Sequence, residues 1–191
     1  KVMTSKKVEQ LTWLVVSLAI VAWTIMAFVE GRSTKGFMGI LTIGSLIVIG
    51  VWQIKGKHQL PPLFAIMSYS FIFVSVGLGT FSGGYQINHF DDFLHVTSGI
   101  WIGYGAWLFM KMMIHENVLA QISKMFIAIY IIIFALAVAG LWELAEFAGD
   151  KLFHFTAQGR DPSDTMYDMI DGLIGGIVTA LFIVRNLKTQ S

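Results

Sequence analysis

Long apolar runs separated by short polar loops dominate the pattern of hydrophobic and polar positions along the chain. Six runs reach or approach the length of about 20 residues that an α-helix needs to cross a bilayer. They cover residues 8–29, 37–54, 62–80, 91–113, 125–147 and 164–184. The loops between them carry turn-forming residues, such as Pro61-Pro62 and Gly83-Gly84. The pattern therefore predicts an all-α, polytopic membrane protein with six transmembrane helices, which form a single membrane domain over residues 1–191.

Composition agrees with this class. Of the 191 residues, 55% are hydrophobic and 13% are charged, whereas a soluble domain carries about 25% charged residues. Mean hydropathy is +0.70, so the lipid bilayer is the first predicted partner. The net charge of +1 indicates no nucleic-acid partner. Cysteine is absent, which removes thiolate metal sites and cysteine nucleophiles. Nothing in the sequence indicates an oligomeric state.

Basic residues predict the orientation of the helices. With six spans both termini share one side of the membrane, and nine lysines and arginines fall there: Lys1, Lys6, Lys7, Lys55, Lys57, Lys111, Lys124, Arg185 and Lys188. Four fall on the opposite side: Arg32, Lys35, Lys151 and Arg160. Because positive charge accumulates on the cytoplasmic side, the bias predicts an N-in/C-in protein. The loops at 81–90 and 150–163 then face outward.

Acidic residues gather on the predicted outer side. Nine of the twelve lie at the outer ends of the last three helices or in the loop beside them: Asp91, Asp92, Glu143, Glu146, Asp150, Asp161, Asp164, Asp168 and Asp171. The last three of these have i, i+4 and i+7 spacing, which places them on one stripe of a helix. Three segments thus bring carboxylates to one depth, and the sequence predicts an outward-facing site there.

A structural explanation covers part of this cluster. Acidic residues in the first turn of a helix commonly cap its free amide groups, and capping is sufficient to explain the positions of Asp91 and Asp164. Capping does not explain Glu143, Glu146, Asp168 and Asp171, which lie further inside their spans. Carboxylates so close together repel one another unless a proton or a cation neutralises them. Oxygen ligands with one imidazole suit Zn²⁺, Mn²⁺ or Fe²⁺, and an oxygen-only subset suits Mg²⁺ or Ca²⁺. The expected cofactor is a divalent metal, with Zn, Mn, Mg and Ca not distinguished.

Three motifs resemble the signature of the YjdF-like bacterial inner-membrane proteins. They are the run Asp91-Asp92-Phe93-Leu94-His95-Val96-Thr97-Ser98-Gly99, the run Trp142-Glu143-Leu144-Ala145-Glu146-Phe147, and the run Asp164-Thr165-Met166-Tyr167-Asp168-Met169 followed by Gly175. The order of residue types is also similar, more loosely, to VanZ-like proteins, which are linked to glycopeptide resistance. The resemblance covers residues 81–184. It implies a multi-pass protein of the bacterial cytoplasmic membrane.

The resemblance points to particular residues of this chain. They are Asp92, His95, Glu143, Glu146, Asp164, Thr165 and Asp168. The chain departs from the pattern at Val96, where an aromatic residue is usual, and at Asp171-Gly172, where apolar residues or an asparagine are common. These departures weaken the VanZ-like comparison most. The resemblance therefore supports the position of the site rather than a reaction.

The leading functional hypothesis is a metal-dependent membrane hydrolase that acts on a lipid-linked or envelope substrate. The expected metal ligands are Asp92, His95, Glu146, Asp164 and Asp168. Glu143 and Asp171 are the candidates for a general base or for a residue that orients the ligands. Arg160 is the candidate contact for a substrate phosphate. No G-x-S-x-G motif is present, which disfavours serine hydrolysis.

Two alternatives belong to other functional classes. A cation or proton transporter would use the acids as a binding relay, although the remaining spans carry few deep polar residues to continue a path. A non-catalytic protein would bind an envelope precursor or an antibiotic.

Overall fold

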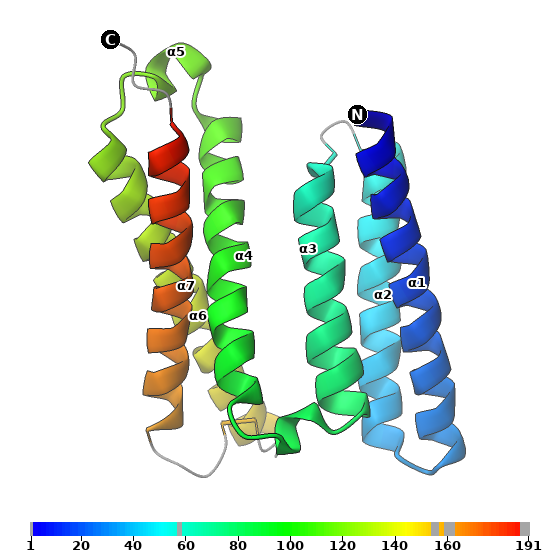
Figure 1. Ribbon diagram of the computed structural model, residues 1–191. Coiled ribbons are helices and arrows are strands. Elements are labelled where there is room, and N and C mark those ends of the chain that lie inside the picture. Colours follow the sequence, from blue (N-terminus) through cyan, green and yellow to red (C-terminus); the bar gives the residue numbers. More distant parts are fainter. Residues whose placement is uncertain (1, 57–58, 154–156, 159–162, 188–191) are drawn as a thin grey trace. The chain divides into compact units, whose positions relative to one another are not determined.

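The computed structural model describes residues 2–56, 59–153, 157–158 and 163–187 (Figure 1). Within this part of the chain the structure is all-α, with seven α-helices, a π-helix and a short 3-10 turn. The helices form two compact units, Lys1–Phe90 and Asp91–Ser191. Each unit is described by itself, and the predicted site falls in the second.

The first unit packs its helices around a small apolar core. Its elements are α1 (Val2–Val29), α2 (Ser33–Lys55), α3 (Pro62–Ile72), the π-helix η1 (Phe73–Phe81) and the 3-10 turn η2 (Gly84–Gln86). Its core consists of Val16, Ile20, Leu46, Ala65 and Tyr69. Close contact between α1 and α2 depends on small residues, because a Cβ at Gly39 would overlap the side chain of Thr24. The indole of Trp13 also donates a hydrogen bond of 2.9 Å to the Leu46 carbonyl.

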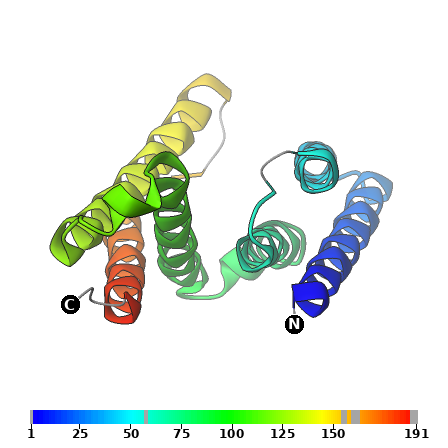
Figure 2. The same cartoon turned by 90° about the horizontal axis from the view of Figure 1, so that it is seen from above.

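The second unit is a three-helix bundle with a short connecting helix (Figure 2). It contains α4 (Phe90–Met113), α5 (Glu116–Leu119), α6 (Lys124–Phe153) and α7 (Asp164–Asn186). The core lies toward the α5 end and consists of Met110, Ile127, Ile131, Ala180 and Ile183. The C-terminal end of α6 and the start of α7 lie at the opposite end (Figure 1). The predicted acidic side chains belong to that end of the unit.

Glycines allow α7 to approach both of its neighbours. A Cβ at Gly99 of α4 would overlap the carbonyl oxygen of Gly172, and one at Gly175 would overlap that of Val96. On another face of α7, a Cβ at Gly176 would lie 2.7 Å from that of Ala135 on α6. Small residues let membrane helices pack at short range. Gly99 with Gly103 and Gly172 with Gly176 have GxxxG spacing, and this spacing is therefore used for helix packing.

Five helical segments are long and apolar enough to cross a membrane: Ser5–Val29, Ser33–Lys55, Pro62–Phe81, Lys124–Leu152 and Asp164–Asn186. They correspond to five of the six predicted spans. The segment α4 is not among them, although its 24 residues would extend about 36 Å at 1.5 Å per residue. The sixth span and the N-in/C-in orientation stay predictions.

One predicted boundary is wrong by several residues. The fifth predicted span ends at residue 147, whereas α6 continues to Phe153. Lys151 lies in the last turn of α6, where its positive charge is favourable at the negative end of the helix dipole. The extension makes Asp150 a helical residue rather than a residue of the following loop.

Substitution of Gly99 by alanine tests the helix contact. The new Cβ would meet the backbone of Gly172, which cannot move away as a flexible side chain does. We expect the free energy of unfolding to fall by about 1–3 kcal/mol, as is typical for overpacking. Thermal unfolding in detergent measures the change. Gly44→Ala is the control, because no atom lies within 4 Å of a Cβ at that position. Equal stability of the two variants would contradict the packing role.

Cysteine labelling tests whether α4 crosses the membrane. The chain has no cysteine, so Gln86→Cys and Gln121→Cys each introduce a single thiol at an exposed position on either side of α4. If α4 spans and the charge bias holds, an impermeant maleimide labels position 86 in intact cells. Position 121 then reacts only after permeabilisation. Labelling of both positions from one side would show that α4 does not cross.

Candidate metal centre

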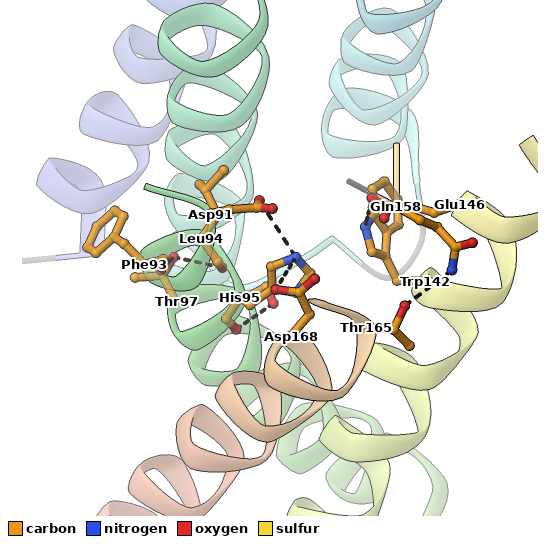
Figure 3. Close-up of polar contacts among 11 residues, drawn as sticks. Asp91, Phe93, Leu94, His95, Thr97, Trp142, Glu146, Gln158, Thr165 and Asp168 are labelled. Carbon is orange, nitrogen blue, oxygen red and sulfur yellow. Dashed lines mark hydrogen bonds and ion pairs between the residues drawn. The ribbon is translucent and has the colours of Figure 1, made fainter. Parts of the chain in front are cut away.

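An aspartate–histidine–aspartate cluster joins α4 to α7. His95 is buried in the second turn of α4, and Asp91 lies one turn before it on the same helix. The imidazole Nε2 lies 3.7 Å from Asp91 Oδ1 and 3.6 Å from Asp168 Oδ1 of α7. Figure 3 shows both carboxylates directed at the same ring nitrogen. The three ligand-type atoms lie within 4.8 Å of one another.

These distances suit a shared cation better than direct hydrogen bonds. A charge-assisted hydrogen bond between nitrogen and oxygen is about 2.7–2.9 Å long. By contrast, two ligands that each lie about 2.1 Å from a tetrahedral ion are about 3.4 Å apart. The observed separations of 3.6 Å and 3.7 Å are close to the second value. Asp91, His95 and Asp168 therefore have the spacing of ligands around an ion.

Two carboxylates in this region are buried, and one of them lacks a hydrogen-bond donor. Asp168 and Glu143 are each only 4% exposed. Asp168 contacts the His95 imidazole at 3.6 Å, which is longer than a charge-assisted hydrogen bond. Thr165 lies close to Glu143, yet neither oxygen of Glu143 has a donor in hydrogen-bonding geometry within the described part. Because buried polar groups in native proteins are almost always paired, the Glu143 carboxylate indicates a place for a proton or a cation.

A second group of carboxylates shares Asp168. Asp92 of α4, Asp168 and Asp171 of α7 bring one oxygen each to within 4.8 Å of one another. Asp171 is half-buried and lies one turn further into α7 than Asp168. Asp92, His95 and Asp168, all predicted as ligands, thus occur in one or the other of the two groups. Asp91 completes the first group. It is not among the predicted ligands, because helix capping is sufficient to explain its position in the sequence.

The other predicted ligands stand outside both groups. Glu146 of α6 accepts a hydrogen bond of 2.8 Å from the indole of Trp142. Asp164 is half-buried in the first turn of α7 and interacts electrostatically with Asp91 and Glu143. The N-cap residue of α7 is Ser163, so Asp164 is a first-turn acid rather than the cap itself. Arg160, the predicted phosphate contact, lies outside the described residues.

Asp150 ties the α6–α7 connection to the end of α6. Its two carboxylate oxygens accept hydrogen bonds from the backbone amides of Ala157 at 2.8 Å and Gln158 at 3.2 Å. The Gln158 side chain then donates to the Thr165 hydroxyl of α7 at 3.2 Å. These bonds position the start of α7, and with it the turn that carries Asp168. The sequence pattern missed this role because it placed Asp150 in a solvated loop.

The fold and this cluster define a helical membrane protein with a candidate cation site near the ends of three helices. The chain belongs to the family described as predicted membrane protein (DUF2238), whose pattern matches residues 11–189. No curated protein and no solved structure matches the chain. The resemblance to YjdF-like and VanZ-like proteins accordingly stays a prediction, and the site must be argued from its own geometry.

Removal of the Asp150 carboxylate tests the connection between α6 and α7. We expect Asp150→Ala to open this connection, because each lost hydrogen bond to a charged acceptor contributes about 1.5–3 kcal/mol. Limited trypsin digestion at Arg160 should then become faster by at least about tenfold. Glu116→Gln on α5 is a control at the opposite end of the unit. Unchanged cleavage in Asp150→Ala would show that these bonds do not hold the connection.

Proposed function

We propose that this membrane protein binds a divalent cation through Asp91, His95 and Asp168 and uses it to hydrolyse a lipid-linked phosphate ester. The observation that carries the proposal is Asp168. Its carboxylate is 4% exposed, lies 3.6 Å from His95 Nε2, and belongs to both groups of ligand-type atoms. Burial of a carboxylate costs several kcal/mol or more unless it is well paired, and a cation held by Asp91, His95 and Asp168 would offset that cost.

The ligand set suits hydrolysis. One imidazole nitrogen with two carboxylate oxygens is a donor set for Zn²⁺, Mn²⁺ or Fe²⁺, and three protein ligands leave coordination positions for water and substrate. A divalent cation supplies two effects there, because it makes a coordinated water more nucleophilic and polarises a phosphoryl oxygen. Glu143 interacts electrostatically with His95 and Asp91. Its free carboxylate is the candidate acceptor for the proton of the attacking water.

The surroundings of the cluster support a lipid-linked substrate. Large aromatic side chains on the same turns are exposed: Phe93 is 55% exposed, Trp142 58% and Tyr167 60%. Aromatic residues concentrate at the level of the lipid head groups. A site at that depth reaches the phosphate of a lipid while the chain of the lipid stays in the bilayer.

The remainder of the second unit supports hydrolysis over transport. Beyond the cluster, the described core consists of apolar residues such as Ile131, Met110 and Ile183. The buried Thr179 hydroxyl is used by a hydrogen bond of 3.1 Å to the Ile100 carbonyl. A permeating ion needs polar groups along its path, and the buried residues of this described core are apolar.

Metal analysis with an activity measurement tests the proposal. Purified protein is loaded with Zn²⁺ or Mn²⁺, and bound metal is measured by mass spectrometry and calorimetry. We expect Asp168→Asn to weaken the tightest binding by about 100-fold, which corresponds to about 3 kcal/mol. Phosphate release from a prenyl diphosphate in micelles should fall in parallel. Glu116→Gln should leave both quantities unchanged, because Glu116 lies on α5.

Each part of the proposal has its own contradicting result. Absence of stoichiometric metal in the wild-type protein under Zn²⁺, Mn²⁺ and Mg²⁺ loads would overturn the cation site. Tight metal binding without phosphate release from any lipid phosphate would overturn the hydrolase and favour a binding protein. If vesicles that contain the protein take up the same ions and Asp168→Asn abolishes this uptake, the result would favour transport instead.

A further inference from the structure

Asp168 is the one residue common to both ligand groups in the described part of the chain. In one group its neighbours are Asp91 and His95, and in the other its neighbours are Asp92 and Asp171. A carboxylate has two oxygens and can hold two ions at once. Two-metal hydrolytic sites place their ions about 3.5–4 Å apart. A bridging carboxylate spans a separation of this size.

The helix geometry keeps the two groups apart. Asp91 and Asp92 are consecutive residues of α4, so their side chains leave the helix about 100° apart. They therefore reach Asp168 from different directions. On α7, Asp171 follows Asp168 by three residues, which brings the two side chains to the same face.

Charge also favours more than one ion. Apart from Asp92, four carboxylates belong to the two groups or interact electrostatically with them: Asp91, Glu143, Asp168 and Asp171. The groups contain one imidazole, that of His95. Glu143 is 4% exposed and has no hydrogen-bond donor among the described residues, and it interacts electrostatically with Asp91 and His95. A single divalent ion balances two of these charges. A second ion balances two more, which lowers the repulsion that otherwise opposes this packing.

We propose that the site holds two divalent cations, with Asp168 as the ligand common to both and with Asp92 and Asp171 completing the second position. This proposal rests on the cation site of the proposed function and adds a second ion to it. The two positions differ in chemistry. The first has a nitrogen ligand and suits Zn²⁺ or Mn²⁺, whereas the second has only oxygen ligands and suits Mg²⁺, Mn²⁺ or Ca²⁺. Mn²⁺ fits both positions.

Titration of the purified full chain with Mn²⁺, followed by electron paramagnetic resonance, tests the pair. We expect two Mn²⁺ per chain in the wild type. Because ions that share a carboxylate are magnetically coupled, the six-line spectrum of isolated Mn²⁺ should be lost when the second equivalent binds. Asp171→Asn should bind one Mn²⁺ and retain the six-line spectrum. Asp92→Asn is an independent variant of the second position and should behave in the same way.

Two further variants assign the positions. His95→Gln removes the nitrogen ligand, so it should weaken the Zn²⁺-selective position by about tenfold or more and leave the second Mn²⁺ in place. Asp168→Asn should weaken both positions. Glu116→Gln should keep two coupled ions. Thermal unfolding of each metal-free variant verifies that the fold is retained, so that a lost ion reports on a lost ligand.

The results separate this proposal from the one on which it rests. One Mn²⁺ per chain in the wild type, unaffected by Asp171→Asn and removed by Asp168→Asn, would overturn the second position and leave the first intact. Two uncoupled Mn²⁺ would overturn the shared ligand. No bound Mn²⁺ and no bound Zn²⁺ in the wild type would overturn both proposals together.

Discussion

The contact between α4 and α7 at Gly99 and Gly175 is the constraint on which the candidate site depends. Each of these glycines lies against the backbone of the other helix, at a distance that no Cβ permits. His95 stands one turn from Gly99, and Asp168 stands one turn from Gly172. The helix approach therefore sets the 3.6 Å separation of His95 and Asp168. Ligand positions must be held within about 0.5 Å, and a backbone contact provides that stiffness.

This packing brings charges together at a cost to stability. Asp168 and Glu143 are removed from water, and no described residue donates a hydrogen bond to Glu143. A protein that needed only a stable bundle would replace them with apolar residues of similar volume. The Glu143 oxygens that lack donors interact electrostatically with His95 and Asp91, which belong to the same cluster as Asp168. A strained, unsatisfied arrangement of this kind is typical of functional sites.

Much of this arrangement was predictable from local sequence patterns. Hydrophobic runs indicated the helices, and the spacing of Asp164, Asp168 and Asp171 indicated one face of α7. The spacing did not show which acids become neighbours, because that depends on the rotation of each helix about its axis. Glu146 therefore turned to Trp142, while Asp91 joined the cluster. The end of α6 was also missed, since the bonds from Asp150 to Ala157 and Gln158 form only after the chain turns back.

A comparison within the chain separates a structural buried acid from a functional one. Glu9 of α1 and Glu143 of α6 are both 4% exposed. Glu9 accepts a hydrogen bond of 2.7 Å from the Gln53 amide, whose oxygen in turn accepts the Leu60 backbone amide at 2.7 Å. That network satisfies its members and fastens the start of α3, which explains Glu9 by packing alone. Glu143 has no such partner in the described part of the chain. Burial is equal in the two cases, so the missing donor, rather than burial itself, is what identifies the cluster around Asp168 as a place for a cation.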